Sequence, residues 1–356
     1  MKRNDTSCGR ITIVGAGAIG GTVGAYLHKA GHDVLLVDAS GEHVERVRSE
    51  GLEIAGARGT ESFKVPIVHT EEFQQSFEDE GETLGTTLLC VKAHHTESAL
   101  RMLVPMLDES GCIVSLQNGM NEDLIREAVG EERTVGTFVH FGADLISPGQ
   151  ITLGYEETIR VGELDGSISP RTRTLSDVLS DAMPAEPTTE VWGYLWGKMV
   201  FAAAGYAVSC VDASVSEVLD DPGGRRAAFK ACSEAYEVGC REVPRLKLIG
   251  TFDPKAFGSA LEQPEVGERE LERLADTWRD QIKKHMGIWR DLRVKRRKTE
   301  GEAQLGPVIQ AGKLRGVSTP VLRAVLSVVT EIEKGERGMD WENLREIEKR
   351  GDSQCS

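Results

Sequence analysis

Three glycines near the start of the chain, Gly15, Gly17 and Gly20, follow a short β-branched run and precede a segment with helical spacing. This spacing permits a tight turn, close approach of the backbone to a pyrophosphate, and close packing of a helix on a strand. Asp38 ends the next apolar run, where a carboxylate can accept the hydroxyls of an adenosine ribose; the alternative is an ordinary polar residue at a strand end. The pattern predicts dinucleotide binding by Gly15, Ala16, Gly17, Ala18, Ile19, Gly20 and Asp38.

Two more polar residues follow apolar runs of the same half. Lys92 follows residues 86–91, and Asn118 follows residues 113–116. Lys92 could approach cofactor phosphates or ribose as a point charge, or it could be a solvated loop lysine. Asn118 precedes a glycine, which indicates a turn, but its amide could also orient a carbonyl near a nicotinamide. The two residues are therefore candidates for cofactor binding.

Lys198 is the one charged residue in the apolar segment 191–211. The length alone would suit a membrane span, but three glycines and a central lysine in an acidic chain favour a buried helix. Burial would lower the pKa of the lysine and suit it to proton transfer near neutral pH; the alternative is a lysine that reaches the surface. Ala202 and Tyr206 share its side of the helix and become candidates for substrate contact.

Charged residues also gather near position 300. Thr299 and Glu302 fit a capping box, which predicts a helix start with Glu300 in its first turn. Glu300 could stabilise the helix dipole, or it could pair with Lys198 or the substrate. Arg290 is a candidate for binding an anionic substrate, although a solvated helix face explains it equally well.

Strands alternate with helices in the first half, which predicts a doubly wound parallel α/β sheet with ligands outside the carboxyl ends of its strands. The second half is predominantly helical, and Pro184–Pro187 suits a linker. We therefore expect a dinucleotide-binding domain over residues 1–187 and a helical substrate or dimerisation domain over 188–356.

The composition excludes several classes of protein. The formal net charge is −15, and the compact basic run is Lys295–Lys298, so nucleic-acid binding is not expected. Seven cysteines without a C-x-x-C pair argue against a disulfide framework or a metal site. Residues 1–8 lack the apolar core of a signal peptide. We expect a cytoplasmic protein that does not bind a membrane.

Five sequence stretches together resemble the ketopantoate reductase family: GAGAIG at 15–20, VKAHHTESAL at 91–100, LQNG at 116–119, WGKM at 196–199 and RKTEGEAQLG at 297–306. The resemblance implies a Rossmann-type domain, an all-helical C-terminal domain, a substrate cleft between them, and a homodimer. It also implies that Lys198 is the catalytic lysine, Asn118 the cleft asparagine and Glu300 the cleft glutamate.

The chain departs from the family pattern at its substrate residues. Ala202 and Tyr206 stand where asparagines are usual, and no serine stands near 286–287. Asp38 would repel a 2′-phosphate, so NAD(H) is favoured over NADP(H). We expect an oxidoreductase for a ketone/secondary alcohol pair other than ketopantoate. The alternatives are a true 2-dehydropantoate 2-reductase and a non-catalytic dinucleotide-binding regulatory protein.

Overall fold

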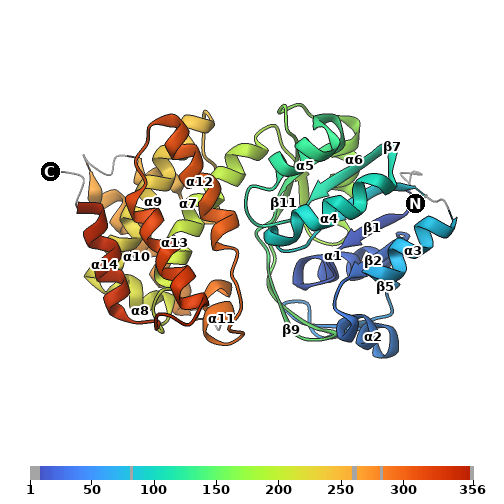
Figure 1. Ribbon diagram of the computed structural model, residues 1–356, viewed down its shortest axis with the longest axis horizontal. Coiled ribbons are helices and arrows are strands. Elements are labelled where there is room, and N and C mark those ends of the chain that lie inside the picture. The colour runs from blue at the N-terminus through green and yellow to red at the C-terminus, as the bar shows by residue number, and fades with distance from the viewer. Residues whose placement is uncertain (1–8, 81–82, 259–262, 281–283, 353–356) are drawn as a thin grey trace. The chain divides into compact units, whose positions relative to one another are not determined.

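The structure is a computed structural model that describes residues 9–80, 83–258, 263–280 and 284–352. It divides into two compact units, Met1–Val191 and Trp192–Ser356. The first, blue to green in Figure 1, is a mixed α/β unit built around a sheet, and the second, yellow-green to red, is helical. The predicted fold class is confirmed.

The main sheet of the first unit has the strand order β12-β11-β8-β7-β6-β1-β2-β5 among the described residues. Its strands are β1 (Ile11–Val14), β2 (Val34–Asp38), β5 (Ile67–His69), β6 (Leu84–Leu89), β7 (Leu107–Ser115), β8 (Thr134–Phe138), β11 (Ile159–Glu163) and β12 (Ala185–Pro187). From β5 to β8 all neighbours are parallel, and β11 runs antiparallel to β8. The expected linker at Pro184–Pro187 is therefore wrong, because most of it forms the edge strand β12.

Helices of the first unit cover both faces of this sheet. They are α1 (Ala18–Lys29), α2 (Gly41–Glu50), α3 (Thr70–Glu80), α4 (Thr96–Leu103), α5 (Glu122–Val129) and α6 (Pro170–Ser180). Ile11 and Ile13 belong to one apolar cluster and Val14 to the other, as alternation along a strand requires. A strand that is buried on both faces reads as a continuous apolar run, which is why β1 could be predicted from sequence.

A second, smaller sheet has the order β4-β3-β10-β9. Its strands are β3 (Leu52–Gly56), β4 (Glu61–Phe63), β9 (Gly142–Ser147) and β10 (Gln150–Tyr155). It packs on α1 so closely that a Cβ at Gly21 would lie 2.8 Å from Ile151 Cδ1. The first unit therefore holds α1 between two sheets.

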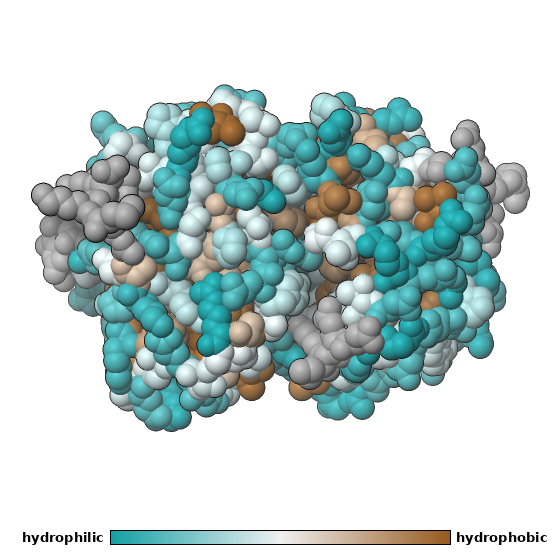
Figure 2. Space-filling view, turned by 180° about the vertical axis from the view of Figure 1, so that it is seen from behind, coloured by the Kyte–Doolittle hydropathy of each residue, from teal (hydrophilic) through white to brown (hydrophobic). Residues whose placement is uncertain are grey.

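The described residues of the second unit form helices and a single isolated bridge between Ile249 and Phe252. The helices are α7 (Val191–Val208), α8 (Val215–Asp220), α9 (Pro222–Glu242), α10 (Pro264–Asp280), α11 (Gly287–Arg293), α12 (Gly301–Arg315), α13 (Pro320–Glu333) and α14 (Trp341–Asp352). No helix in the described part of the chain is long and apolar enough to span a bilayer. Figure 2 shows a largely hydrophilic face with small, separate apolar patches.

Candidate functional site

Four neighbouring parallel strands, β2, β1, β6 and β7, end at one edge of the main sheet. Asp38 is the last residue of β2, Gly15 follows β1, Lys92 lies three residues after β6, and Asn118 lies three residues after β7. β1 has β2 on one side and β6 on the other, so the strand order reverses here. Such a switch point is where open α/β sheets bind ligands.

The three glycines of the loop after β1 are required for different reasons, either packing within the protein or space for a ligand. Gly15 has a φ of +98°, and a Cβ there would lie 2.7 Å from Val91 N. A Cβ at Gly20 would lie 2.0 Å from the Gly15 carbonyl oxygen. Gly17 has an ordinary φ of −68°, and its Cβ would meet no protein atom within 4 Å. Packing therefore requires glycine at 15 and 20, whereas at Gly17 the open space suits a ligand.

The N-terminus of α1 begins beside that open space. Its N-cap, Gly17, has no side chain to cap the first N–H groups, and the first turn holds no acidic residue. Residues 17–19 are partly exposed. Uncapped N–H groups and the positive end of the helix dipole favour an anion at this place.

Asp38 is held by the backbone on both carboxylate oxygens. Oδ2 accepts the Ala16 N–H at 2.8 Å, and Oδ1 accepts the Ser40 N–H at 2.9 Å. Each oxygen has a further lone pair, and the side chain is partly exposed, so it can still accept hydroxyl groups. Residues 39–45 contain no Lys or Arg that could neutralise a phosphate next to this carboxylate.

A buried polar network holds the loops that carry Lys92 and Asn118. Gln117 Nε2 donates to the Val91 carbonyl and to Thr96 Oγ1, both at 2.8 Å. Thr96 Oγ1 in turn donates to Asn121 Oδ1 at 3.2 Å, and Asn121 Nδ2 donates to the Asn118 carbonyl at 2.8 Å. The Asn118 side chain is exposed and the Lys92 side chain is partly exposed. The network fixes the two backbones and leaves these side chains at the surface.

Glu122 begins α5, four residues after Asn118, and is fully buried. Burial raises the pKa of its carboxyl to about 7. A carboxyl group with this pKa changes its charge near neutrality, next to the turn that carries Asn118.

In the second unit, Lys198 lies in α7 and is partly exposed, while Ala202 and Tyr206 are buried on the same side of the helix. Tyr206 is 1% exposed, and a Cβ at Gly301 would lie 3.3 Å from its Cε1. Burial raises the pKa of its hydroxyl well above 10, and the charge of Glu300 raises it further. Tyr206 therefore packs against the start of α12.

The predicted capping box at the start of α12 is wrong, although the helix does begin at Gly301. Glu300 is the N-cap without a capping side-chain bond, and Thr299 Oγ1 accepts the Gly301 N–H at 3.0 Å. The Thr299 N–H donates to Glu333 of α13 at 2.7 Å, while Glu302 pairs with Lys298. A residue distant in sequence has taken the place of the local partner.

Arg290 lies in α11 and is partly exposed. Arg293, in the last turn of α11, is paired with Asp212 at 2.8 Å. Met286 and Gly287, where a family serine would be expected, lie at the start of α11, and Met286 Sδ would be 2.7 Å from a Cβ at Gly205. This part of α11 therefore packs on α7 next to Tyr206.

Two family models match the chain: Ketopantoate reductase PanE/ApbA over residues 11–166, and Ketopantoate reductase PanE/ApbA C terminal over residues 190–333. The chain belongs to the ketopantoate reductase family. As a member, it is an NAD(P)-dependent oxidoreductase that acts on CH–OH or ketone groups.

Individual relatives agree with this assignment. A 2-dehydropantoate 2-reductase from Archaeoglobus fulgidus is 28% identical over 329 residues, which cover 92% of this chain and 98% of the relative. The fold is similar to that of a D-mandelate dehydrogenase with NADH and anilino(oxo)acetate (TM-score 0.78, 23% identity, 92% and 99% covered). It is also similar to a dimeric ketopantoate reductase from Staphylococcus aureus (TM-score 0.68, 14% identity, 92% and 100% covered).

Several residues of this ketopantoate reductase family member were missed by reasoning from sequence. Gln117, Thr96 and Asn121 form the network under the loops, and His43 bonds to the glycine-rich loop. Gln117 stands next to Asn118 in the QNG motif, so its position was a usable signal. Thr96 lies in the VKAHHTESAL stretch and Asn121 lies three residues after Asn118, so both were close to a signal in the sequence. His43 had none, because Ala16 and Gly149 lie 27 and 106 residues away.

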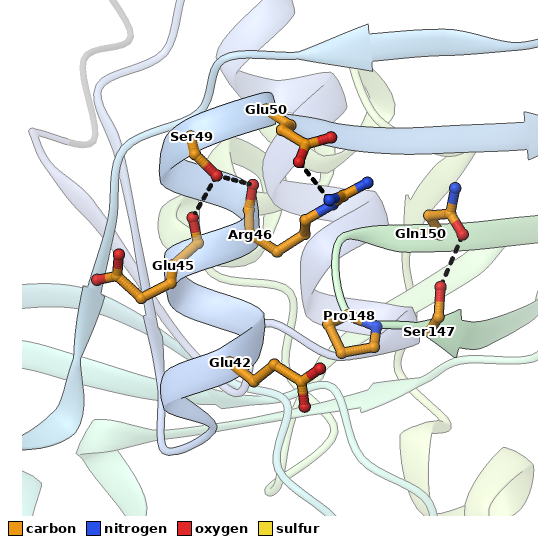
Figure 3. Close-up of a pocket in the computed structure, with 8 residues that line it drawn as sticks. All are labelled: Glu42, Glu45, Arg46, Ser49, Glu50, Ser147, Pro148 and Gln150. Carbon is orange, nitrogen blue, oxygen red and sulfur yellow. Dashed lines mark hydrogen bonds and ion pairs between the residues drawn. The ribbon is translucent and has the colours of Figure 1, made fainter.

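A pocket of about 490 Å³ lies between α2 and the turn that joins β9 to β10 (Figure 3). It is lined by Glu42, Glu45, Arg46, Ser49, Glu50, Ser147, Pro148 and Gln150. Arg46 bonds to Glu50, and Ser147 to Gln150, so much of its polar lining is internally paired. No residue predicted from sequence lines this pocket.

Proposed function

We propose that the chain transfers a hydride between NAD(H) and a ketone/secondary alcohol pair other than ketopantoate. The observation that carries the proposal is the common edge of β2, β1, β6 and β7, where the glycine-rich loop, Asp38, Lys92 and Asn118 follow neighbouring strands. The open space at Gly17 and the uncapped start of α1 fit a pyrophosphate there.

Residues of the first unit would hold the dinucleotide. The N–H groups at the start of α1 would bind the pyrophosphate, and Asp38 would accept the adenosine ribose hydroxyls. Its negative charge, with no cation in residues 39–45, disfavours a 2′-phosphate and supports NAD(H) over NADP(H). Lys92 and Asn118 would contact the ribose or nicotinamide end.

The residues of the second unit would supply acid–base chemistry. The bound nicotinamide exchanges a hydride with the substrate carbon. Lys198 would stabilise the charge that develops on the carbonyl oxygen and give it a proton. Glu300 would hold the lysine ammonium or a water in place, and Arg290 would pair with an anionic group of the substrate.

The residues on α7 support a substrate other than ketopantoate. Ala202 and Tyr206 stand where asparagines are usual in the family. The chain therefore lacks two amide groups that could bind a hydroxyl and a carboxylate. Sites built on hydrogen bonds discriminate strongly when a partner is missing. The curated relatives named 2-dehydropantoate 2-reductase favour the second candidate, a true ketopantoate reductase.

We further propose a homodimer, as for the Staphylococcus aureus protein, in the cytoplasm, where the free thiols of the described cysteines stay reduced. Light scattering of the purified protein tests the dimer. A mass of one chain would contradict it.

The experiment that tests the function is NADH oxidation with a panel of 2-oxo acids, namely ketopantoate and acids with aliphatic or aromatic side chains. We expect turnover with a panel member other than ketopantoate, and its loss in Lys198→Ala with NADH binding retained. If kcat/KM is highest with ketopantoate, the result supports the second candidate, a true ketopantoate reductase. Binding of NADH without turnover of any acid would indicate a regulatory protein.

A further inference from the structure

His43 lies in the first turn of α2, and its side chain is almost completely buried. Its Nε2 is 3.0 Å from the Ala16 carbonyl oxygen, and its Nδ1 is 3.0 Å from the Gly149 backbone nitrogen. Because the Gly149 N–H can only donate, Nδ1 must accept, and the ring proton is on Nε2. His43 is therefore neutral, and it donates to the glycine-rich loop.

These two bonds belong to a longer hydrogen-bonded chain. The Ala16 N–H donates to Asp38 Oδ2 at 2.8 Å, while the Ala16 carbonyl accepts from His43. On the other side of the ring, the Gly149 carbonyl accepts the Glu53 N–H at 2.8 Å. The chain runs from the end of β2 through the loop to the turn between β9 and β10 and on to β3. The two bonds on the imidazole ring, one accepted at Nδ1 and one donated from Nε2, share one polarisable group and strengthen each other.

The turn that contacts His43 packs closely against α2. Gly149 has a φ of +75°, and a Cβ there would lie 2.6 Å from Arg46 Cγ of α2. Figure 3 shows this turn, with Pro148, facing α2. His43 therefore connects the loop to a turn that packs against α2 and can serve as its support.

The loop needs such a support because Ala16 lies between two glycines. Gly15 and Gly17 give the peptide groups on either side of Ala16 more rotational freedom than other residues would. Asp38 fixes the N–H of Ala16 and His43 fixes its carbonyl. A loop held in its binding conformation before the ligand arrives has less entropy to lose on binding.

We propose that His43 is a positioning residue for the dinucleotide, holding the Ala16 carbonyl so that the loop after β1 keeps its binding conformation in the free protein. This rests on the proposed function, since the loop is taken as the pyrophosphate site. It also gives the smaller sheet a part in cofactor binding, through Gly149.

Two substitutions separate the bonds made by the ring. In His43→Gln the side-chain amide reaches the place of Nε2 and can still donate to Ala16. In His43→Asn the amide oxygen reaches the place of Nδ1 and keeps only the bond from Gly149. Val47→Ala is the matched control, because Val47 is buried one turn further along α2 and makes no bond to the loop.

The readouts are the NADH dissociation constant and the amide exchange rate of Ala16, whose N–H is bonded to Asp38, in the ligand-free protein. We expect NADH binding within about twofold of wild type in His43→Gln and about five- to tenfold weaker in His43→Asn, the range for one buried hydrogen bond. Exchange of the Ala16 N–H should rise in His43→Asn alone, because the loop that holds this amide against Asp38 becomes looser. Val47→Ala should lower the thermal midpoint and leave both readouts unchanged.

Equal NADH binding in His43→Asn and wild type would overturn the proposal. So would equal weakening in His43→Asn and Val47→Ala, or no recovery in His43→Gln. If the wild-type protein binds no dinucleotide, the proposed function fails instead, and the exchange rates still decide whether His43 holds the loop.

Discussion

Substitution of Gly17 by alanine separates ligand binding from folding at the glycine-rich loop. The φ of −68° at Gly17 suits any residue, and the added Cβ would meet no protein atom within 4 Å. Replacing glycine at such a compatible position stabilises a protein by about 0.4–1 kcal/mol, because the unfolded chain loses freedom. We therefore expect Gly17→Ala to fold at least as stably as wild type.

Dinucleotide binding should respond in the opposite direction. The methyl group would occupy the space through which a pyrophosphate approaches the start of α1, so we expect NADH to bind at least about tenfold more weakly, or about 1.4 kcal/mol. Denaturant unfolding and nicotinamide fluorescence measure the two effects. Gly306→Ala is the matched control, since Gly306 lies within α12 with open space at its Cβ.

Gly306→Ala should gain stability without changing NADH binding. Gly20→Ala should lose stability, because its Cβ would lie 2.0 Å from the Gly15 carbonyl oxygen. Wild-type NADH affinity in Gly17→Ala would refute the reasoning, because the open space would then not be the pyrophosphate site. A loss of stability in Gly17→Ala would refute the statement that no protein atom requires this glycine.

Three further substitutions test other parts of the account. Asp38→Asn should reduce the preference for NADH over NADPH by about tenfold in paired titrations, since it removes the charge that repels a 2′-phosphate. Lys198→Ala should lower kcat by about 10²- to 10⁴-fold, the usual contribution of a general acid, with the NADH dissociation constant unchanged. Glu122→Gln concerns stability: burial raises the folded-state pKa of Glu122 from 4.5 to about 7. The folded protein then binds the proton more tightly than the unfolded chain, so this group costs stability as the pH rises from about 4.5 to 7. Glu122→Gln should remove that cost and raise the free energy of unfolding by up to about 3 kcal/mol above pH 7. Urea unfolding at pH 5 and pH 8 measures this gain, which should be larger at pH 8. An equal gain at both pH values would contradict the reasoning.

Much of the first unit could be predicted because its strands are buried on both faces. β1 and β2 read as short apolar runs, and the loop between β1 and α1 has a local glycine spacing. The smaller sheet was not predicted as a sheet, because its central pair joins β3 to β10, about 100 residues later. Patterns over a few neighbouring residues do not predict which distant strands pair.

The same distinction separates the site residues that were predicted from those that were missed. Gly15, Asp38 and Asn118 follow apolar runs, so their place at the sheet edge could be inferred. The role of His43 depends on Gly149, and the start of α12 is capped through Glu333 instead of Glu302. In these cases the partner is decided by tertiary packing, and propensity alone gives the wrong partner or none.

The central claim is that the edge formed by β2, β1, β6 and β7 binds NAD(H) through the loop and Asp38. Titration of the purified protein with NADH and NADPH, followed by nicotinamide fluorescence, tests it most directly. We predict saturable NADH binding that is at least about tenfold tighter than NADPH binding. Tighter binding of NADPH would contradict the role given to Asp38, and binding of neither would contradict the assignment of this edge as the dinucleotide site.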